Sequence, residues 1–168
     1  MKLAFLGLGV MGYPMAGHLA KTHDVTVYNR TTAKADAWVK EHGGAMGATP
    51  AEAVKGAEIV LSCVGNDDDL RSVTIGQGGA FAGMKPGAIF VDHTTVSAQV
   101  TAELYAAAKD AGLHFVDAPV SGGQAGAENG QLSIMCGGDQ AAYDKAAPVM
   151  EIYAKLCRRI GESGAGQM

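Results

Sequence analysis

The sequence predicts an α/β protein with a Rossmann-type, doubly wound, mainly parallel sheet that carries helices on both faces. Short apolar runs alternate along the chain with segments of helical period, and the connections between them are short. Glycine accounts for 24 of the 168 residues, about twice its usual share of roughly 7%. Alternation of this kind requires parallel strands joined by right-handed crossovers. The length suits one domain with a substantial core.

The predicted strands are short apolar runs that end near glycine or polar residues. In chain order they cover residues 3–6, 25–28, 45–47, 59–64, 88–91, 113–116, 132–135 and 156–160. The run at 59–64 is apolar almost throughout, which is typical of a strand in a parallel sheet with both faces covered. This run therefore supports a sheet that lies between two layers of helices.

The predicted helices begin at capping residues, and several of them end at glycine. They cover residues 11–20, 31–42, a segment from 49, a segment from 67, 97–111 and 139–153. Thr49 precedes Pro50 and Glu52, which is the arrangement of a capped helix start. Ser97 caps a segment whose apolar residues recur at helical spacing. The carboxylates of Asp67–Asp69 suit the positive end of a helix dipole.

The first twenty residues could be mistaken for a signal peptide or a membrane span. Residues 3–20 contain no Asp, Glu, Lys or Arg, and Lys2 precedes them. The same stretch holds four glycines and Pro14, which a spanning helix rarely tolerates together. We therefore expect a strand, a glycine-rich turn and a helix here, with no membrane segment and no secretion signal.

Charge and cysteine content exclude several classes of protein. The net charge is −4, and the densest basic cluster is Lys155 with Arg158 and Arg159, so nucleic acid is not an expected partner. Cys63, Cys136 and Cys157 are odd in number, far apart and outside any C-x-x-C motif. They predict reduced thiols in a cytoplasmic protein, and no metal site is predicted.

Residues 7–12 form the motif G-x-G-x-x-G, in the order Gly7, Leu8, Gly9, Val10, Met11 and Gly12. The motif follows the first predicted strand and opens the first predicted helix, which is the context of a dinucleotide-binding loop. Gly7 would allow the tight turn, Gly9 the approach of a pyrophosphate, and Gly12 the close packing of helix on strand. The helix N-terminus would then bind the pyrophosphate. The alternative is a structural turn without a ligand.

The end of the second strand predicts NADP in preference to NAD. An NAD site usually has Asp or Glu at this point to accept from the ribose 2′-hydroxyl, but the sequence reads Tyr28-Asn29-Arg30-Thr31. Arg30 can pair with a 2′-phosphate, and Asn29 and Thr31 can add hydrogen bonds. The alternative is that Arg30 is an ordinary surface arginine.

Three motifs resemble those of the β-hydroxyacid dehydrogenases, the family of 3-hydroxyisobutyrate dehydrogenase and of glyoxylate and succinic semialdehyde reductases. The segment Gly7–Ala16 is similar to the family's opening. The segment Asp117–Gly123, with Gly126 and Gly130 after it, resembles its substrate-binding loop. The segment Val91–Ser97 is similar to the strand end on the nicotinamide side. The motifs occur in the family's order along the whole chain.

The resemblance implies roles for particular residues. Ser121 and the N–H groups of Gly122 and Gly123 would hold a substrate carboxylate, because a hydroxyl and two unhindered amides are good anion donors. The alternative for this stretch is a glycine-rich turn between strands.

The resemblance also implies that Val64, Gly65 and Thr95 line the cofactor near its nicotinamide end. His93 and His114 are expected to be structural, since the family uses neither as a proton donor.

The resemblance further implies a catalytic lysine outside this sequence. Gly164-Ala165-Gly166-Gln167-Met168 begins the family pattern G-x-G-x-x-x-K, whose lysine would fall two residues past Met168. We therefore expect an NAD(P)-binding domain at 1–162 and the start of an interdomain helix at 163–168. The family continues with an all-α domain, and the full-length protein is expected to form a homodimer or homotetramer.

The expected function is an NADP-dependent oxidoreductase that interconverts a small β-hydroxyacid and its semialdehyde or oxo acid, with this chain alone inactive. Three alternatives stay open: an imine reductase, an enzyme like 6-phosphogluconate dehydrogenase, and a non-catalytic dinucleotide-binding module. The glycine-rich substrate loop favours a carboxylate substrate over an imine.

Overall fold

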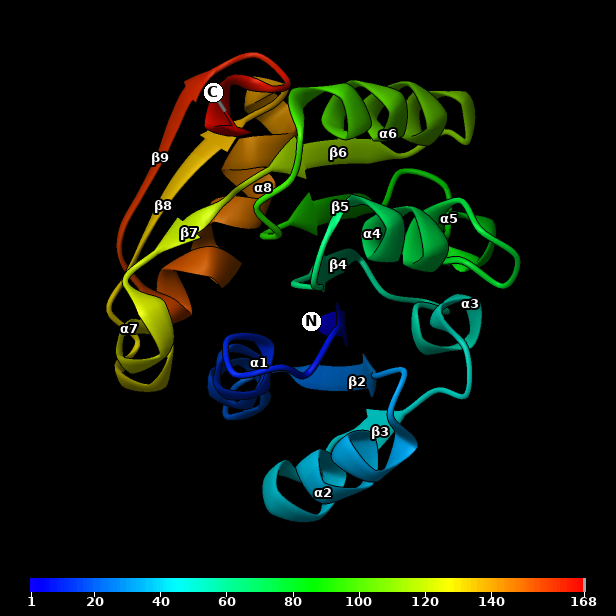
Figure 1. The fold of residues 1–168 in the computed structure, drawn as a ribbon, viewed down its shortest axis with the longest axis vertical. Helices are drawn as coiled ribbons and strands as arrows, with labels where there is room; N and C mark the ends of the chain where they lie inside the picture. Colours follow the sequence, from blue (N-terminus) through cyan, green and yellow to red (C-terminus); the bar gives the residue numbers. More distant parts are fainter. Residues whose placement is uncertain (168) are drawn as a thin grey trace.

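The computed structural model describes residues 1–167 as a sheet between two layers of helices (Figure 1). The strands are β1 (Lys2–Leu6), β2 (Asp24–Tyr28), β3 (Ala45–Met46), β4 (Ile59–Ser62), β5 (Ile89–Asp92), β6 (His114–Asp117), β7 (Val120–Ser121), β8 (Leu132–Gly137) and β9 (Ala154–Gly161). The α-helices are α1 (Gly12–Ala20), α2 (Thr32–His42), α3 (Pro50–Ala53), α4 (Asp67–Thr74), α5 (Ala80–Gly83), α6 (Ala98–Asp110), α7 (Gly123–Asn129) and α8 (Gln140–Met150). Two 3-10 turns, η1 (Glu151–Tyr153) and η2 (Ala165–Gln167), complete the described elements.

The sheet follows the order β3-β2-β1-β4-β5-β6, and all of these neighbours are parallel. This is the strand order of a doubly wound Rossmann sheet, so the predicted fold class is confirmed. The chain leaves β1 toward β2 on one side and returns to pair β4 on the other. Leu6 lies level with both Tyr28 and Ser62, so three loops leave the sheet side by side at this switch point.

The far edge of the sheet departs from the parallel pattern. Strand β8 runs antiparallel to both β6 and β7, and β9 pairs parallel to β8. A run of apolar residues predicts a strand but carries no information about its direction. The expectation of a mainly parallel sheet holds, and only the structure reveals that β8 and β9 run in the opposite direction to the other strands.

The core has two layers because side chains alternate across each strand. Leu3 and Phe5 of β1 face the cluster under α1, α2 and α8, where Trp38 is fully buried. Ala4 and Leu6 of the same strand face the cluster under α3, α4, α5 and α6, where Phe90 stacks on Phe115. Both faces of the sheet are therefore covered, as the apolar strand at 59–64 predicted.

Short-range sequence patterns, such as capping residues, predicted most ends of the helices and strands correctly. The Thr49 side chain accepts from Glu52 N at 3.2 Å, and the Ser97 hydroxyl accepts from Val100 N at 3.2 Å. Thr31 and Asp139 occupy cap positions, but neither side chain makes a capping hydrogen bond. Asp139 instead accepts from the Tyr105 hydroxyl at 3.0 Å.

Three short elements were not predicted. They are α5, β7 and α7, of four, two and seven residues. Helix α7 contains Gly123 and Gly126, and glycine disfavours helix interiors, so local propensity argued against it. Within the described residues, the helices are too short or too polar to cross a bilayer.

Candidate functional site

A cleft of about 400 Å³ lies at the switch point, where β1, β2 and β4 end. Open α/β sheets bind their ligands at this place, outside the carboxyl ends of the strands. Ten of the twelve residues predicted to contact a cofactor line it: Gly7, Leu8, Gly9, Val10, Met11, Gly12, Asn29, Arg30, Val64 and Gly65. The fold thus gathers residues from three separate loops around one cavity.

Two glycines of the loop are required by the protein itself. Gly7 has a φ of +99°, and a side chain there would collide with the Cys63 carbonyl at the end of β4. A side chain at Gly12 would collide with the Gly7 carbonyl. Close contact between backbone segments therefore explains both residues without a ligand.

Gly9 has no such structural reason. Its φ is not in the left-handed region, and among the described residues nothing lies within 4 Å of a Cβ placed there. The position lies on the wall of the cleft, so a side chain would project into open space. A group that approaches the backbone from outside would explain why the residue is glycine.

Some backbone N–H groups of the loop donate hydrogen bonds within the protein, and others have no acceptor among the described residues. Gly7 N donates to Tyr28 O at 2.9 Å, and Leu8 N donates to Asn29 Oδ1 at 2.9 Å. Among residues 1–167 the N–H groups of 9–12 have no protein acceptor. Free N–H groups at the start of a helix form an anion site.

Asn29, Arg30 and Thr31 follow the end of β2 and have different roles. Asn29 Oδ1 holds Leu8 N, and its Nδ2 donates to Thr31 O at 3.0 Å, so this amide mainly shapes the loops. The Arg30 side chain is 84% exposed and reaches the cleft. Thr31 occupies the N-cap position of α2 and does not line the cleft.

The structure adds residues to the cleft that the sequence motifs did not mark. They are Tyr28, Cys63, Asp69, Ser72 and Val73. Asp69 Oδ1 lies 3.4 Å from Arg30 Nη1, which places a carboxylate beside the predicted phosphate-binding arginine. Burial, reinforced by Asp92, raises the pKa of the Cys63 thiol to about 12, so this thiol stays protonated and unreactive.

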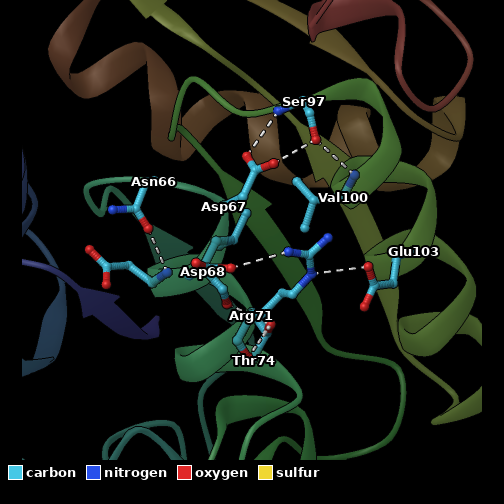
Figure 2. Close-up of polar contacts among 10 residues, drawn as sticks. Asn66, Asp67, Asp68, Arg71, Thr74, Ser97, Val100 and Glu103 are labelled. Atoms are coloured by element: carbon cyan, nitrogen blue, oxygen red, sulfur yellow. Dashed lines mark hydrogen bonds and ion pairs between the residues drawn. The ribbon is translucent and has the colours of Figure 1, made fainter.

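Polar contacts tie the loops after β4 and β5 together. Val64 N donates to the Thr94 hydroxyl at 3.0 Å. Figure 2 shows the second link, in which the Asp67 carboxylate accepts from Ser97 N at 3.0 Å and from the Ser97 hydroxyl at 2.7 Å. The Ser97 hydrogen bonds also hold the pKa of Asp67 below its usual range.

Thr95 lies outside the main cleft. It lines an adjoining hollow together with Gly65, which borders both spaces. Arg71 of α4 lines the same hollow and pairs with Glu103 of α6 at 3.1 Å and with Asp68 at 3.3 Å (Figure 2). The two helix starts that flank Gly65 and Thr95 are thereby held in one arrangement.

Two buried titratable groups lie beneath these loops. Asp92 accepts at Oδ1 from the Ser62 hydroxyl and from Thr94 N, while its buried Oδ2 has no partner among the described residues. Burial raises the pKa of Asp92 to about 7.

His93 is also buried, and both of its ring nitrogens have partners. Nδ1 lies 2.7 Å from Ala118 O and Nε2 lies 2.6 Å from the Tyr153 hydroxyl. Burial lowers the pKa of His93 to about 4. These contacts support the structural role expected for His93, and His114 lies exposed at the start of β6.

Asp117, at the end of β6, binds the last described segment of the chain. Its carboxylate accepts from Gly164 N at 2.8 Å and from Gln167 N at 3.2 Å. The Gln167 side chain in turn donates from Nε2 to Thr94 O at 2.7 Å. Residues 164–167 are thus anchored beside the loop after β5, while Met168 lies outside the described residues.

Ser121, Gly122 and Gly123 form an exposed turn that leads from the end of β7 into the start of α7. Gly122 and Gly123 have φ values of +130° and +64°, which explains glycine at both positions. None of the three lines the hollows described above, although α7 borders a further hollow of about 630 Å³ that also includes Gly9 and Val10. The structure therefore keeps this turn separate from the main cleft.

The sheet order, the glycine turn and the cleft at the switch point define a Rossmann-type domain. Comparison with known proteins then identifies its family. A sequence profile described as the NAD binding domain of 6-phosphogluconate dehydrogenase matches residues 2–161. An uncharacterized oxidoreductase of Shewanella frigidimarina is 57% identical over 168 residues, which cover 99% of this chain and 58% of that protein.

Solved structures agree with this assignment. The structure of 3-hydroxyisobutyrate dehydrogenase from Mycobacterium tuberculosis with L-serine matches with a TM-score of 0.91 and 34% identity, over 99% of this chain and 56% of that one. The structure of Psf3 in complex with NADP+ and 2-OPP matches with a TM-score of 0.92 and 28% identity, over 98% and 58% of the two chains.

The chain belongs to the family of the NAD-binding domain of 6-phosphogluconate dehydrogenase, among the 3-hydroxyisobutyrate dehydrogenase-like β-hydroxyacid dehydrogenases. It spans 58% of the Shewanella oxidoreductase and 56% of the Mycobacterium tuberculosis enzyme. The resemblance inferred from the three sequence motifs is confirmed.

The two buried groups yield a prediction about stability and pH. Between pH 4 and pH 7 the folded Asp92 carboxyl holds a proton that the unfolded chain has released, so its contribution to stability falls as pH rises. His93 acts in the opposite sense, because its pKa is lowered and its contribution is lost as pH falls toward 4. A tenfold change in an acid dissociation constant between the folded and unfolded chain corresponds to about 1.4 kcal/mol.

We expect Asp92→Asn to remove the pH-dependent contribution of Asp92 to stability. The free energy of unfolding of this variant, relative to the wild type, should rise from pH 4 to pH 7, measured by urea denaturation at several pH values. The control is Asp36→Asn, which removes an exposed carboxyl on α2. If the Asp92→Asn and wild-type curves run parallel over this interval, Asp92 is not protonated in the folded protein.

Proposed function

We propose that this chain is the NADP-binding part of an oxidoreductase that interconverts a small β-hydroxyacid and its semialdehyde or oxo acid. The observation that supports dinucleotide binding is the open space beside Gly9. No contact within the described protein requires a glycine at this position. Gly9 opens the run of N–H groups at 9–12 that lack a protein acceptor. These groups fit the pyrophosphate that the family's cofactor carries.

Different residues around the cleft would bind different parts of the cofactor. The loop at 7–12 would bind the pyrophosphate, and Arg30 would pair with the 2′-phosphate of the adenosine ribose. Val64, Gly65 and Thr95 would border the nicotinamide, on the side where the loops after β4 and β5 are tied together. The relative solved with NADP+ supports NADP as the dinucleotide.

Substrate binding would fall to the exposed turn after β7. The Ser121 hydroxyl and the N–H groups of Gly122 and Gly123 would hold a carboxylate. When bound, the nicotinamide supplies the hydride chemistry. The family resemblance assigns proton transfer to a lysine two residues past Met168, so we propose that the 168 residues alone bind the dinucleotide without appreciable turnover.

Other parts of the proposal concern the whole protein. We propose that an all-α domain follows this one, that the full-length protein is a homodimer or homotetramer, and that it works in the cytoplasm. Cys63, Cys136 and Cys157 are free thiols, which suits a reducing compartment.

Gly9→Ala tests the dinucleotide site without disturbing the fold. Because a methyl group at this position meets open space, the variant should keep its stability or gain up to about 1 kcal/mol. The same methyl group should block the pyrophosphate, so titration of NADPH fluorescence should show a loss of binding of about tenfold or more.

Gly12→Ala is the matched control for this experiment. Its methyl group collides with the Gly7 carbonyl, so it should lower the free energy of unfolding by about 3 kcal/mol. Unchanged NADPH affinity in a stable Gly9→Ala protein would contradict the proposed site.

Arg30→Ala tests the preference for NADP. Loss of the guanidinium should weaken NADPH binding about tenfold and leave NADH binding nearly unchanged, because only NADPH carries the 2′-phosphate. The control is Lys34→Ala, which removes an exposed cation on α2 that does not line the cleft. An equal loss of affinity for both dinucleotides would exclude Arg30 as the phosphate-binding residue.

A further inference from the structure

Asp69 brings to the cleft the carboxylate that the end of the second strand lacks. It belongs to the first turn of α4, far in sequence from Arg30, yet its Oδ1 lies 3.4 Å from Arg30 Nη1. Both side chains line the cleft. The place where the ribose of a dinucleotide is normally read therefore contains one cation and one anion.

The two partners of this ion pair differ in freedom. The Arg30 side chain is 84% exposed, whereas that of Asp69 is 29% exposed. Asp69 N donates to Asn66 Oδ1 at 2.8 Å, which fixes its backbone at the start of α4. Its Oδ2 lies so close to Gly65 that a Cβ there would be 2.8 Å away. The carboxylate is therefore carried by a fixed backbone and mostly shielded from solvent, whereas the arginine side chain extends into solvent.

We infer that Asp69 is a specificity-determining residue, which weakens the preference for NADP over NAD that Arg30 provides. This inference rests on the proposed dinucleotide site. A 2′-phosphate carries close to two negative charges, so it must compete with Asp69 for Arg30 and is repelled by the carboxylate. The 2′-hydroxyl of NAD carries no charge and can donate to a carboxylate.

The exposed ion pair does not prevent the competition. Pairs of this kind contribute about 0–1 kcal/mol, so a phosphate can displace Asp69 from Arg30. The carboxylate nevertheless stays near the bound phosphate, because the Asp69 backbone is fixed at the start of α4 and the side chain is short. Asp69 therefore acts on the ratio of the two affinities and leaves binding of both dinucleotides possible.

The neighbouring acids of the same turn are engaged elsewhere. Asp67 accepts from Ser97, and Asp68 pairs with Arg71 at 3.3 Å with a side chain that is 93% exposed (Figure 2). Asp68 does not line the main cleft. Asp68→Asn therefore removes the same charge from the same helix turn without changing the surroundings of Arg30, and it serves as the matched control.

The experiment measures dissociation constants for NADPH and NADH with the wild-type chain, Asp69→Asn and Asp68→Asn, by titration of the intrinsic fluorescence of each reduced dinucleotide. Asp69→Asn should tighten NADPH relative to NADH by about five- to tenfold. Asp68→Asn should change this ratio by less than about twofold, because screened surface charges at longer range have little effect. The Asp69→Asn effect should also shrink as salt is added.

The outcomes separate the two proposals. If Asp69→Asn shifts the ratio no more than Asp68→Asn does, the role of Asp69 is excluded while the dinucleotide site stands. If the wild-type chain binds neither NADPH nor NADH, the site itself and the inference about Asp69 both fail. A thermal unfolding curve for each variant verifies that the compared proteins are folded.

Discussion

The close approach of backbone to backbone at the switch point is the constraint on which the rest of the site depends. Gly7 touches the end of β4 and Gly12 touches Gly7, with no room for a side chain at either position. This contact turns the chain from β1 into α1, where the N–H groups of 9–12 have no acceptor among the described residues. Asn29 adds a hydrogen bond to Leu8 N, so the loop is shaped by the protein before any ligand arrives.

The strand ends beyond this turn are joined by polar contacts between loops. Thr94 accepts from Val64 N, Asp67 accepts from Ser97, and Gln167 bonds Thr94 O. Because these links connect separate crossovers, they set the loops relative to one another and not only relative to their own strands. The buried carboxyl of Asp92 lies under the same loops, where desolvation keeps its pKa high. The region that would border the nicotinamide is therefore a single connected structure.

Sequence reasoning succeeded where a short-range pattern carries the physics. The glycine spacing at 7–12 predicted a strand, a turn and a helix, because Gly7 allows the tight turn and Gly12 allows the close packing of helix on strand. Thr49 and Ser97 predicted helix starts, since a cap acts only three residues along the chain. It missed α7, whose glycines disfavour a helix locally, and the direction of β8, which depends on a neighbouring strand and not on its own residues.

The sequence by itself determined the fold class, the nucleotide-type loop and the family, because hydrophobic period, glycine spacing and motif order are properties of the chain alone. Only the tertiary structure decided which residues share the cleft. It brought Asp69 to Arg30 across two crossovers, moved Thr31 and Thr95 out of the main cavity, and showed that Gly9 faces no other part of the described protein. The physical reason is that contacts between distant segments depend on how strands pair and helices pack, and no local pattern records that arrangement.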